Sequence, residues 1–173
     1  PIGNVGFRMN LMSVAFSVLT LLMAYYFIFR MTSSALSSFF GTVLLAFTPV
    51  FWSQSLNAEV YPLHTFFVAL IMLLLLRWDE NRKAYRLILL AFISGISFCN
   101  HIQTVMLAPA VLFIIVSGDY KVLFTPRLII SVSLFFLIAL SIYVYLPLRT
   151  EAGAAIHYGD PDNIDRFLTH VTA

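Results

Sequence analysis

Charged residues are scarce in this sequence, and cysteine is nearly absent. Ten Lys and Arg residues and eight Asp and Glu residues make up 10% of the 173 positions, whereas ordinary soluble domains carry about 25%. With 61% hydrophobic residues, the chain has more apolar surface than its own core can bury, which excludes a soluble globular fold. The single cysteine excludes an internal disulfide framework and a cysteine-rich metal site.

Several familiar motifs are missing as well. The sequence contains no Walker-type phosphate loop, no GxGxxG, no HExxH and no CxxC pair, so it gives no support to nucleotide, zinc-protease or thiol-redox chemistry. It also lacks a basic soluble patch, which excludes nucleic acid as a partner. These absences leave membrane-embedded functions as the class to consider.

The sequence consists mainly of long blocks without Lys, Arg, Asp or Glu. The blocks are Met9–Phe29, Ala35–Trp52, Pro62–Leu76, Leu87–Gly118 and Leu128–Leu148. About 20 apolar residues cross the hydrocarbon core as a helix, so four blocks predict one crossing each. The block of 32 residues is interrupted by the polar cluster Cys99–Gln103 and predicts two short helices. We therefore predict an all-α, polytopic transmembrane helical bundle of about six membrane helices, at residues 9–29, 35–52, 62–78, 85–98, 104–117 and 128–146.

The basic residues between the blocks predict an orientation, because cytoplasmic loops are enriched in Lys and Arg. With the N-terminus outside, the inner connections hold seven basic residues: Arg30, Arg77, Arg82, Lys83, Arg86, Lys121 and Arg127. The outer connections hold three, which are Arg8, Arg149 and Arg166. Residues 1–148 then form the transmembrane region, and residues 149–173 form a truncated extracytoplasmic segment. The polar clusters Ser53–His64 and Cys99–Gln103 also fall on the outer side.

The outer polar residues each have two interpretations. Glu59 is either a solvated loop acid before a helix or a carboxylate aimed into an interfacial site. Asn100 and His101 are either turn and capping residues or groups that hydrogen-bond a sugar or orient Glu59. Arg149 follows YVYLPL, where arginine commonly snorkels to the interface and where a lipid phosphate also lies.

Four stretches of the sequence carry a family resemblance. They are GFRMNLMSVAF, FTPVFWSQSLNAEVYPLHTFFVALIMLLLLRW, the NH of FCNHIQ, and YLPLRTEAGAAIHYGDPDNIDRFLTHVT. Together they resemble a polytopic membrane family, long known as a domain of unknown function, that includes transmembrane protein 260, an animal protein O-mannosyltransferase. Such proteins are similar to the C-type glycosyltransferases (GT-C), which take a sugar from a polyprenyl-phosphate donor on the extracytoplasmic or luminal side.

The resemblance implies a function and a set of partners. It implies a multi-pass enzyme of the bacterial inner membrane or endoplasmic reticulum that transfers a sugar, with mannose as one candidate, to a hydroxyl of a protein or glycan acceptor. It leaves a divalent metal open and assigns no metal ligand. Two alternatives from other classes stay open: a lipid or solute translocator and a non-catalytic membrane scaffold.

The resemblance also implies roles for individual residues. Relatives begin with a further helix and an acidic outer loop, so this chain is expected to be an internal fragment whose principal catalytic base lies upstream. Glu59 is then a supporting acid that orients the acceptor or a metal. Arg149 is the candidate contact for the donor phosphate, because a guanidinium grips phosphate bidentately. The second-tier candidates for binding the substrate are Tyr61, His64, Asn100 and His101.

Overall fold

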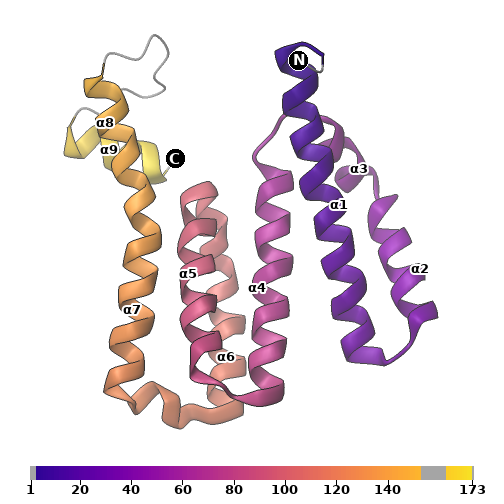
Figure 1. The fold of residues 1–173 in the computed structure, drawn as a ribbon, viewed down its shortest axis with the longest axis vertical. Coiled ribbons are helices and arrows are strands. Elements are labelled where there is room, and N and C mark those ends of the chain that lie inside the picture. Colours follow the sequence, from indigo (N-terminus) through magenta and orange to yellow (C-terminus); the bar gives the residue numbers. More distant parts are fainter. Residues whose placement is uncertain (1–2, 153–162, 173) are drawn as a thin grey trace.

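The computed structural model describes residues 3–152 and 163–172, and every regular element within these ranges is helical (Figure 1). The all-α prediction is thus confirmed. The α-helices are α1 (Val5–Thr32), α2 (Ala35–Ala46), α3 (Pro49–Leu56), α4 (Tyr61–Asn81), α5 (Ala84–Asn100), α6 (Ala108–Asp119), α7 (Pro126–Leu140), α8 (Tyr145–Glu151) and α9 (Ile164–Thr172). They are joined or continued by the 3₁₀ segments η1 (Ile102–Leu107), η2 (Tyr120–Phe124) and η3 (Ser141–Val144).

Four of the described helical stretches are long and apolar enough to cross a membrane: Val5–Thr32, Tyr61–Asn81, Ile102–Phe124 and Pro126–Glu151. The pair α2 and α3 makes a fifth crossing if it counts as one span. Large apolar side chains remain exposed, for example Met106 at 79% and Phe113 at 72%, as expected of lipid-facing positions. The chain is a multi-pass membrane protein. The predicted count of six would need the apolar helix α5, of 17 residues, as a further crossing.

The prediction of a single helix over residues 35–52 is wrong. The segment is divided into α2 and α3, whose axes are bent by 66°. Pro49 has no backbone N–H to donate, and inside a helix its ring would meet the carbonyl of the residue four positions earlier. The residue before a proline also avoids helical geometry, and Thr48 is extended at φ −64° and ψ 136°. The break therefore follows from one proline in an otherwise apolar block.

The last predicted helix, over residues 128–146, extends further than expected at both ends. The chain is helical from Pro126 through η3 to Glu151. Arg149, expected at the start of an extracytoplasmic segment, lies instead in the last turn of α8. Of the remaining residues of that predicted segment, 153–162 and 173 lie outside the described residues. The first helix is also longer than predicted, because α1 includes Arg8 and ends at Thr32.

The helices form a row in the order α2, α1, α4, α5 and α7, and α6 packs against α4 (Figure 1). The buried centre of this row consists of Ile71, Leu75, Trp78, Leu87 and Leu90. Gly95 allows α5 to approach α7 closely. A Cβ atom at Gly95 would lie 2.7 Å from Ala139 Cβ and 2.8 Å from the Phe136 carbonyl oxygen. Small residues at helix contacts are typical of membrane bundles, where close packing replaces the hydrophobic effect.

Helix α1 carries a polar stripe within an apolar block. Ser13, Ser17 and Thr20 are buried, and their spacing of four and three residues places them on one face. Thr20 Oγ1 donates a hydrogen bond to the Phe16 carbonyl oxygen at 2.9 Å. The Phe16 ring also packs against Phe66 of α4, with centroids 5.5 Å apart. The buried stripe therefore belongs to the side of α1 that meets the rest of the bundle.

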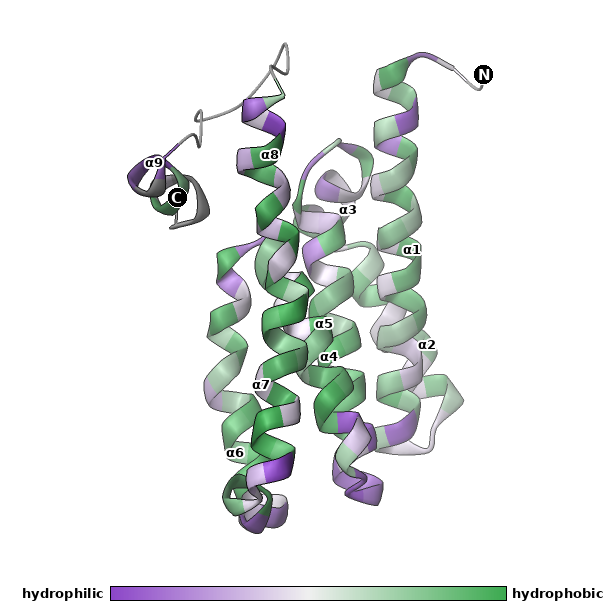
Figure 2. Ribbon diagram, turned by 60° about the vertical axis from the view of Figure 1, so that its left-hand side comes forward, coloured by the Kyte–Doolittle hydropathy of each residue, from purple (hydrophilic) through white to green (hydrophobic). Residues whose placement is uncertain are grey.

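Basic residues gather at the end of the bundle drawn at the bottom of Figure 2. This end holds the last turn of α1, the connection from α4 to α5, η2 and the start of α7, and it therefore includes the seven residues predicted to be cytoplasmic. An ion pair of 2.6 Å between Arg30 and Glu80 joins α1 to α4 there. The arrangement agrees with the charge pattern on which the predicted orientation rests, and the orientation itself remains a prediction.

Candidate functional site

Five of the candidate residues lie at the end of the bundle opposite the basic one. They are Glu59, Tyr61, His64, Asn100 and His101, which belong to the start of α4, the loop before it, and the end of α5 (Figure 1). Helix α4 begins at Tyr61 because Pro62 favours the first helical turn, where its missing N–H needs no partner. Residues about 40 positions apart in the sequence are thus brought to one place.

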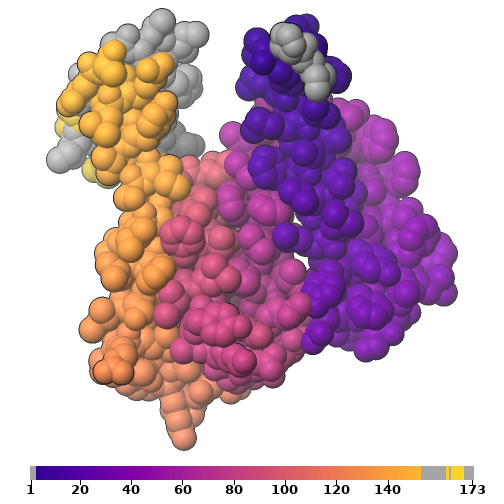
Figure 3. Space-filling model, viewed as in Figure 1, coloured from indigo at the N-terminus to yellow at the C-terminus, as the bar shows by residue number. Residues whose placement is uncertain are grey.

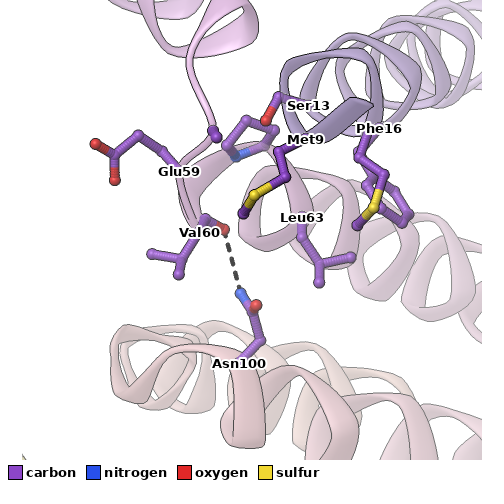
Figure 4. Close-up of a pocket in the computed structure, with 10 residues that line it drawn as sticks. Met9, Ser13, Phe16, Glu59, Val60, Leu63 and Asn100 are labelled. Atoms are coloured by element: carbon purple, nitrogen blue, oxygen red, sulfur yellow. Dashed lines mark hydrogen bonds between the residues drawn. The ribbon is translucent and has the colours of Figure 1, made fainter. Parts of the chain in front are cut away.

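Hydrogen bonds hold the loop before α4. Asn57 Nδ2 donates to the Ser53 carbonyl at 2.9 Å, and the Glu59 N–H donates to the Asn57 carbonyl at 2.9 Å. From the neighbouring helix, Asn100 Nδ2 donates to the Val60 carbonyl at 3.3 Å (Figure 4). Asn100 therefore ties the end of α5 to the start of α4. It contacts the backbone next to Glu59 and makes no hydrogen bond to the Glu59 carboxylate.

His101 packs against two rings of α4. Helix α5 ends because His101 is extended, at φ −156° and ψ 126°. Its ring centroid lies 5.0 Å from that of His64 and 5.7 Å from that of Tyr61. His101 Nδ1 accepts a hydrogen bond from the Gln103 N–H at 3.3 Å. By contrast, His64 Nδ1 is buried and has no hydrogen-bond partner within the described residues.

A pocket of about 300 Å³, the methionine pocket, opens beside this cluster. It is lined mainly by apolar side chains, including Met9, Phe16 and Leu63, with Asn100 and Glu59 at its edge (Figure 4). The Glu59 side chain is exposed, and Figure 4 shows its carboxylate pointing away from the cavity. The structure therefore places Glu59 beside a cavity without directing its carboxylate into it.

A second pocket, of about 520 Å³, lies on the other side of the first turn of α4, and Pro62 lines both pockets. We call it the glutamine pocket. Its polar lining comes from α1, the residue before α3, α3, α4 and η1, and consists of Ser17, Thr48, Gln54, Tyr61, His64, Thr65 and Gln103. The Gln54 Oε1 atom is buried and, like His64 Nδ1, has no hydrogen-bond partner in the described part of the chain.

Arg149 is not brought together with the other candidates. It lies in α8, is exposed, and lines neither the methionine pocket nor the glutamine pocket. Figure 3 shows a hollow between the N-terminal half of α1 and the upper part of α7 and α8, above the ends of α4 and α5. A ligand that touched both Arg149 and the histidine cluster would therefore have to bridge this hollow.

Within residues 3–152 and 163–172, no group of three or more His, Cys, Asp and Glu residues is arranged to hold a metal ion. The cluster of five residues offers amide, imidazole and phenol groups beside the one carboxylate of Glu59. Such groups donate and accept hydrogen bonds with neutral polar ligands.

Residues 1–123 match the family model described as the Protein O-mannosyl-transferase TMEM260 N-terminal domain. The chain belongs to this family. It is also 30% identical to Protein O-mannosyl-transferase TMEM260 of Mus musculus over 179 aligned residues, which cover 98% of this chain and 25% of the mouse protein. The chain thus spans about a quarter of the length of that relative. No solved structure matches the chain significantly.

The resemblance drawn from the sequence motifs is thereby confirmed. The part that matches the TMEM260 N-terminal domain contains all five residues of the cluster and ends before Arg149. The similarity to the mouse protein covers 98% of the chain, so it extends beyond residue 123 into the region of α7 and α8. The name of the mouse protein describes an O-mannosyl-transferase and specifies neither the sugar donor nor the membrane orientation.

Sequence reasoning missed most of the glutamine pocket. Gln54 and Gln103 lie inside the two outer polar clusters, but neither is among the candidates that the sequence analysis names. Ser17 lies in an apolar block, where a single serine carries little information. The available signal was the spacing of Ser13, Ser17 and Thr20, which predicts one polar face on an otherwise apolar helix.

Proposed function

We propose that this chain forms part of the active site of a membrane O-mannosyltransferase of the GT-C type. In this proposal a mannose passes from a polyprenyl-phosphate donor to a hydroxyl of a protein or glycan acceptor, on the extracytoplasmic or luminal side. The observation that carries the proposal is the meeting of five polar and aromatic side chains beside two pockets, at the end of the bundle opposite the basic residues, in a chain of the TMEM260 family.

The proposed reaction needs an attacking hydroxyl, a base that takes its proton and a cation that stabilises the leaving group. The acceptor oxygen attacks the anomeric carbon, the bond from that carbon to the phosphate oxygen breaks, and the phosphate leaves with the electron pair. A carboxylate takes the acceptor proton, and a cation stabilises the departing phosphate. At this end of the bundle, Arg149 supplies the guanidinium for the phosphate, and Glu59 supplies a second, supporting carboxylate that is distinct from the proton-accepting base.

Glu59 acts in this proposal as a supporting acid that orients the acceptor. Its side chain makes no hydrogen bond or ion pair with the described residues, so turning the carboxylate toward the methionine pocket breaks no existing interaction. Asn100 assists by fixing the backbone at Val60, the residue that follows Glu59. Tyr61, His64 and His101 would contact the bound substrate.

The test is a transfer assay on the protein expressed from its native gene and reconstituted in lipid nanodiscs. Polyprenyl-phosphate mannose and a Ser/Thr-containing peptide are supplied, and mannosyl peptide is measured. Glu59→Gln should lower the rate by at least about tenfold, which is less than the roughly 10²–10⁴-fold that a general base supplies, because Glu59 orients the acceptor and does not take its proton. Glu151→Gln, which changes an exposed acid in α8, is the matched control and should keep the parental rate.

Two results would overturn the proposal. Movement of the lipid-linked sugar across the bilayer without any mannosyl peptide would identify a translocator. If the folded protein shows neither transfer nor translocation, the scaffold interpretation remains. If transfer occurs and Glu59→Gln is as active as Glu151→Gln, the role assigned to Glu59 is wrong and the carboxylate is a solvated loop acid.

A further inference from the structure

Gln54 and His64 line the glutamine pocket, and each carries a buried polar atom whose lack of a partner within the described ranges needs an explanation. Gln54 Oε1 and His64 Nδ1 are buried without a hydrogen-bond partner in the described residues. Leaving such an atom unpaired costs about 1–3 kcal/mol, and buried polar groups in native proteins nearly always find protein or solvent partners. The two atoms come from α3 and α4, so their common presence in one pocket depends on the bend at Pro49.

The chemistry of the lining restricts which ligand groups can hydrogen-bond to Gln54 and His64. Gln54 Oε1 only accepts hydrogen bonds, whereas a histidine ring nitrogen donates or accepts according to its tautomer. A hydroxyl group serves both atoms, because it donates and accepts. Ser17, Thr65 and Gln103 add further donors and acceptors to the same lining. The pocket is therefore suited to a ligand with several hydroxyl groups.

Charge and size support the same conclusion. None of the described residues that line the pocket is Asp, Glu, Lys or Arg, so the lining offers no cation for a phosphate. The aromatic rings of Phe51 and Tyr61 border it, and aromatic faces suit the C–H side of a ring-shaped ligand. Its volume of about 520 Å³ lies in the range of small-molecule sites, which is roughly 300–1,000 Å³.

We infer that the glutamine pocket is a binding site for a neutral pyranose, whose hydroxyl groups bond to Gln54 Oε1 and His64 Nδ1 when the two side chains turn these buried atoms toward the cavity. The inference rests on the proposed function, since it assigns a place to a sugar within that site. The bound pyranose has two possible sources, which are the sugar carried by the donor and a sugar already attached to the acceptor. The adjoining methionine pocket, with its apolar lining, remains for a less polar part of the substrates.

The test measures binding without requiring transfer. Methyl α-D-mannopyranoside, which lacks phosphate and lipid, is titrated onto the reconstituted protein and followed by saturation-transfer-difference NMR. Gln54→Leu keeps a similar volume and removes the acceptor oxygen, so the dissociation constant should rise about three- to tenfold, as for the loss of one hydrogen bond. Ser53→Ala, the neighbouring exposed position of α3, is the matched control and should bind as the parent does.

A second variant guards against misfolding. Gln103→Leu changes an exposed residue of η1 that lines the same pocket, so it is expected to fold even if Gln54→Leu does not. Weaker binding in either folded variant, with an unchanged control, supports the inference. Equal affinity in every folded variant overturns it, and so does the absence of any mannoside signal, which would mean that water alone fills the pocket.

Competition identifies the source of the sugar. Polyprenyl-phosphate mannose should displace the mannoside if the pocket takes the donor sugar, and a mannosylated peptide should displace it if the pocket takes the acceptor glycan. Failure of the inference is distinct from failure of the proposed function. Transfer that is insensitive to Gln54 leaves the enzyme standing without this subsite, whereas mannoside binding through Gln54 without transfer leaves a sugar-binding protein that is not a transferase.

Discussion

The buried hydroxyl oxygens of Ser97 and Thr104 lie 2.7 Å apart and form a hydrogen bond across the break between α5 and η1. Thr104 Oγ1 also lies 2.9 Å from the His101 carbonyl oxygen. The two flanks of His101 are thus joined by side chains, although the backbone at His101 is extended. This bond fixes the direction in which the chain presents His101 to Tyr61 and His64.

Removing the Ser97 hydroxyl should loosen this connection. Ser97→Ala is expected to lower the free energy of unfolding by about 1 kcal/mol, because one buried hydrogen bond is lost while Thr104 keeps its contact with His101. Denaturant titration in mixed micelles measures the change. Ser141→Ala changes an exposed serine whose hydroxyl bonds to the Ile138 carbonyl one turn earlier, and it should change stability by less than about 0.5 kcal/mol. Equal effects of the two substitutions would contradict the role assigned to Ser97.

The contact between α5 and α7 should not tolerate a methyl group at Gly95. Gly95→Ala is expected to cost about 1–3 kcal/mol, because the new Cβ meets the Phe136 carbonyl and the Ala139 side chain. Gly41→Ala is the matched control. Its Cβ would lie 2.9 Å from Ile28 Cδ1, the end of a flexible side chain, so a gain in helix propensity should offset a small adjustment. Thermal melting in detergent compares the two, and a stable Gly95→Ala variant would show that α5 and α7 separate easily.

The predicted orientation is tested by labelling cysteines from outside the cell. In a Cys99→Ala background, Glu59→Cys and His101→Cys should react with an impermeant maleimide, since they lie at the end with few basic residues. Lys83→Cys, at the opposite end, should react only after the membrane is permeabilised. Labelling of Lys83→Cys in intact cells would reverse the orientation and move the candidate site to the cytoplasmic side.

Substituting Arg149 distinguishes a contact with the donor phosphate from a simple anchor at the membrane interface. Arg149→Lys keeps the charge and loses the planar fork, so donor affinity should fall about tenfold if two charge-assisted hydrogen bonds become one. The measurement is the dissociation constant for polyprenyl-phosphate mannose. Arg8→Lys, an exposed arginine of α1 at the same end, is the control and should bind the donor as the parent does. Full donor affinity in Arg149→Lys would show that the residue only snorkels.

Hydropathy is enough to locate the helices, but it does not fix where they begin and end. Arg8 lies within α1 because backbone hydrogen bonds continue a helix past the apolar region. Pro49 is visible in the sequence, yet the apolar block around it suggests one continuous helix. For His64 and His101 the sequence predicts only that both residues lie on the same side of the membrane. Their ring contact depends on how α4 and α5 pack, which no local pattern contains.

The pockets are beyond sequence reasoning for a related reason. Gln54 reaches the same cavity as His64 because α3 turns away from the direction of α2 at Thr48. For Arg149 the sequence suggests a proximity that the structure does not show. Sequence position groups it with the other outer residues, whereas the helical continuation from α7 into α8 carries it to another part of that end. Two residues on the same side of the membrane are therefore expected to lie close together only when the helices that carry them pack against each other.

The length of α5 has a consequence for how a substrate arrives. Its 17 residues rise about 26 Å, which is less than the hydrocarbon thickness of about 30 Å, and its start is marked by Lys83 and Arg86, as expected at an interface. With Lys83 at one interface, the end with Asn100 and His101 would lie about 4 Å short of the opposite edge of the hydrocarbon layer, which is still within reach of water and of a labelling reagent. A sugar tethered to a lipid reaches that depth by lateral diffusion within one leaflet. Occupancy of the site would then follow the mole fraction of the donor in the membrane, and its concentration in the surrounding water would have little influence.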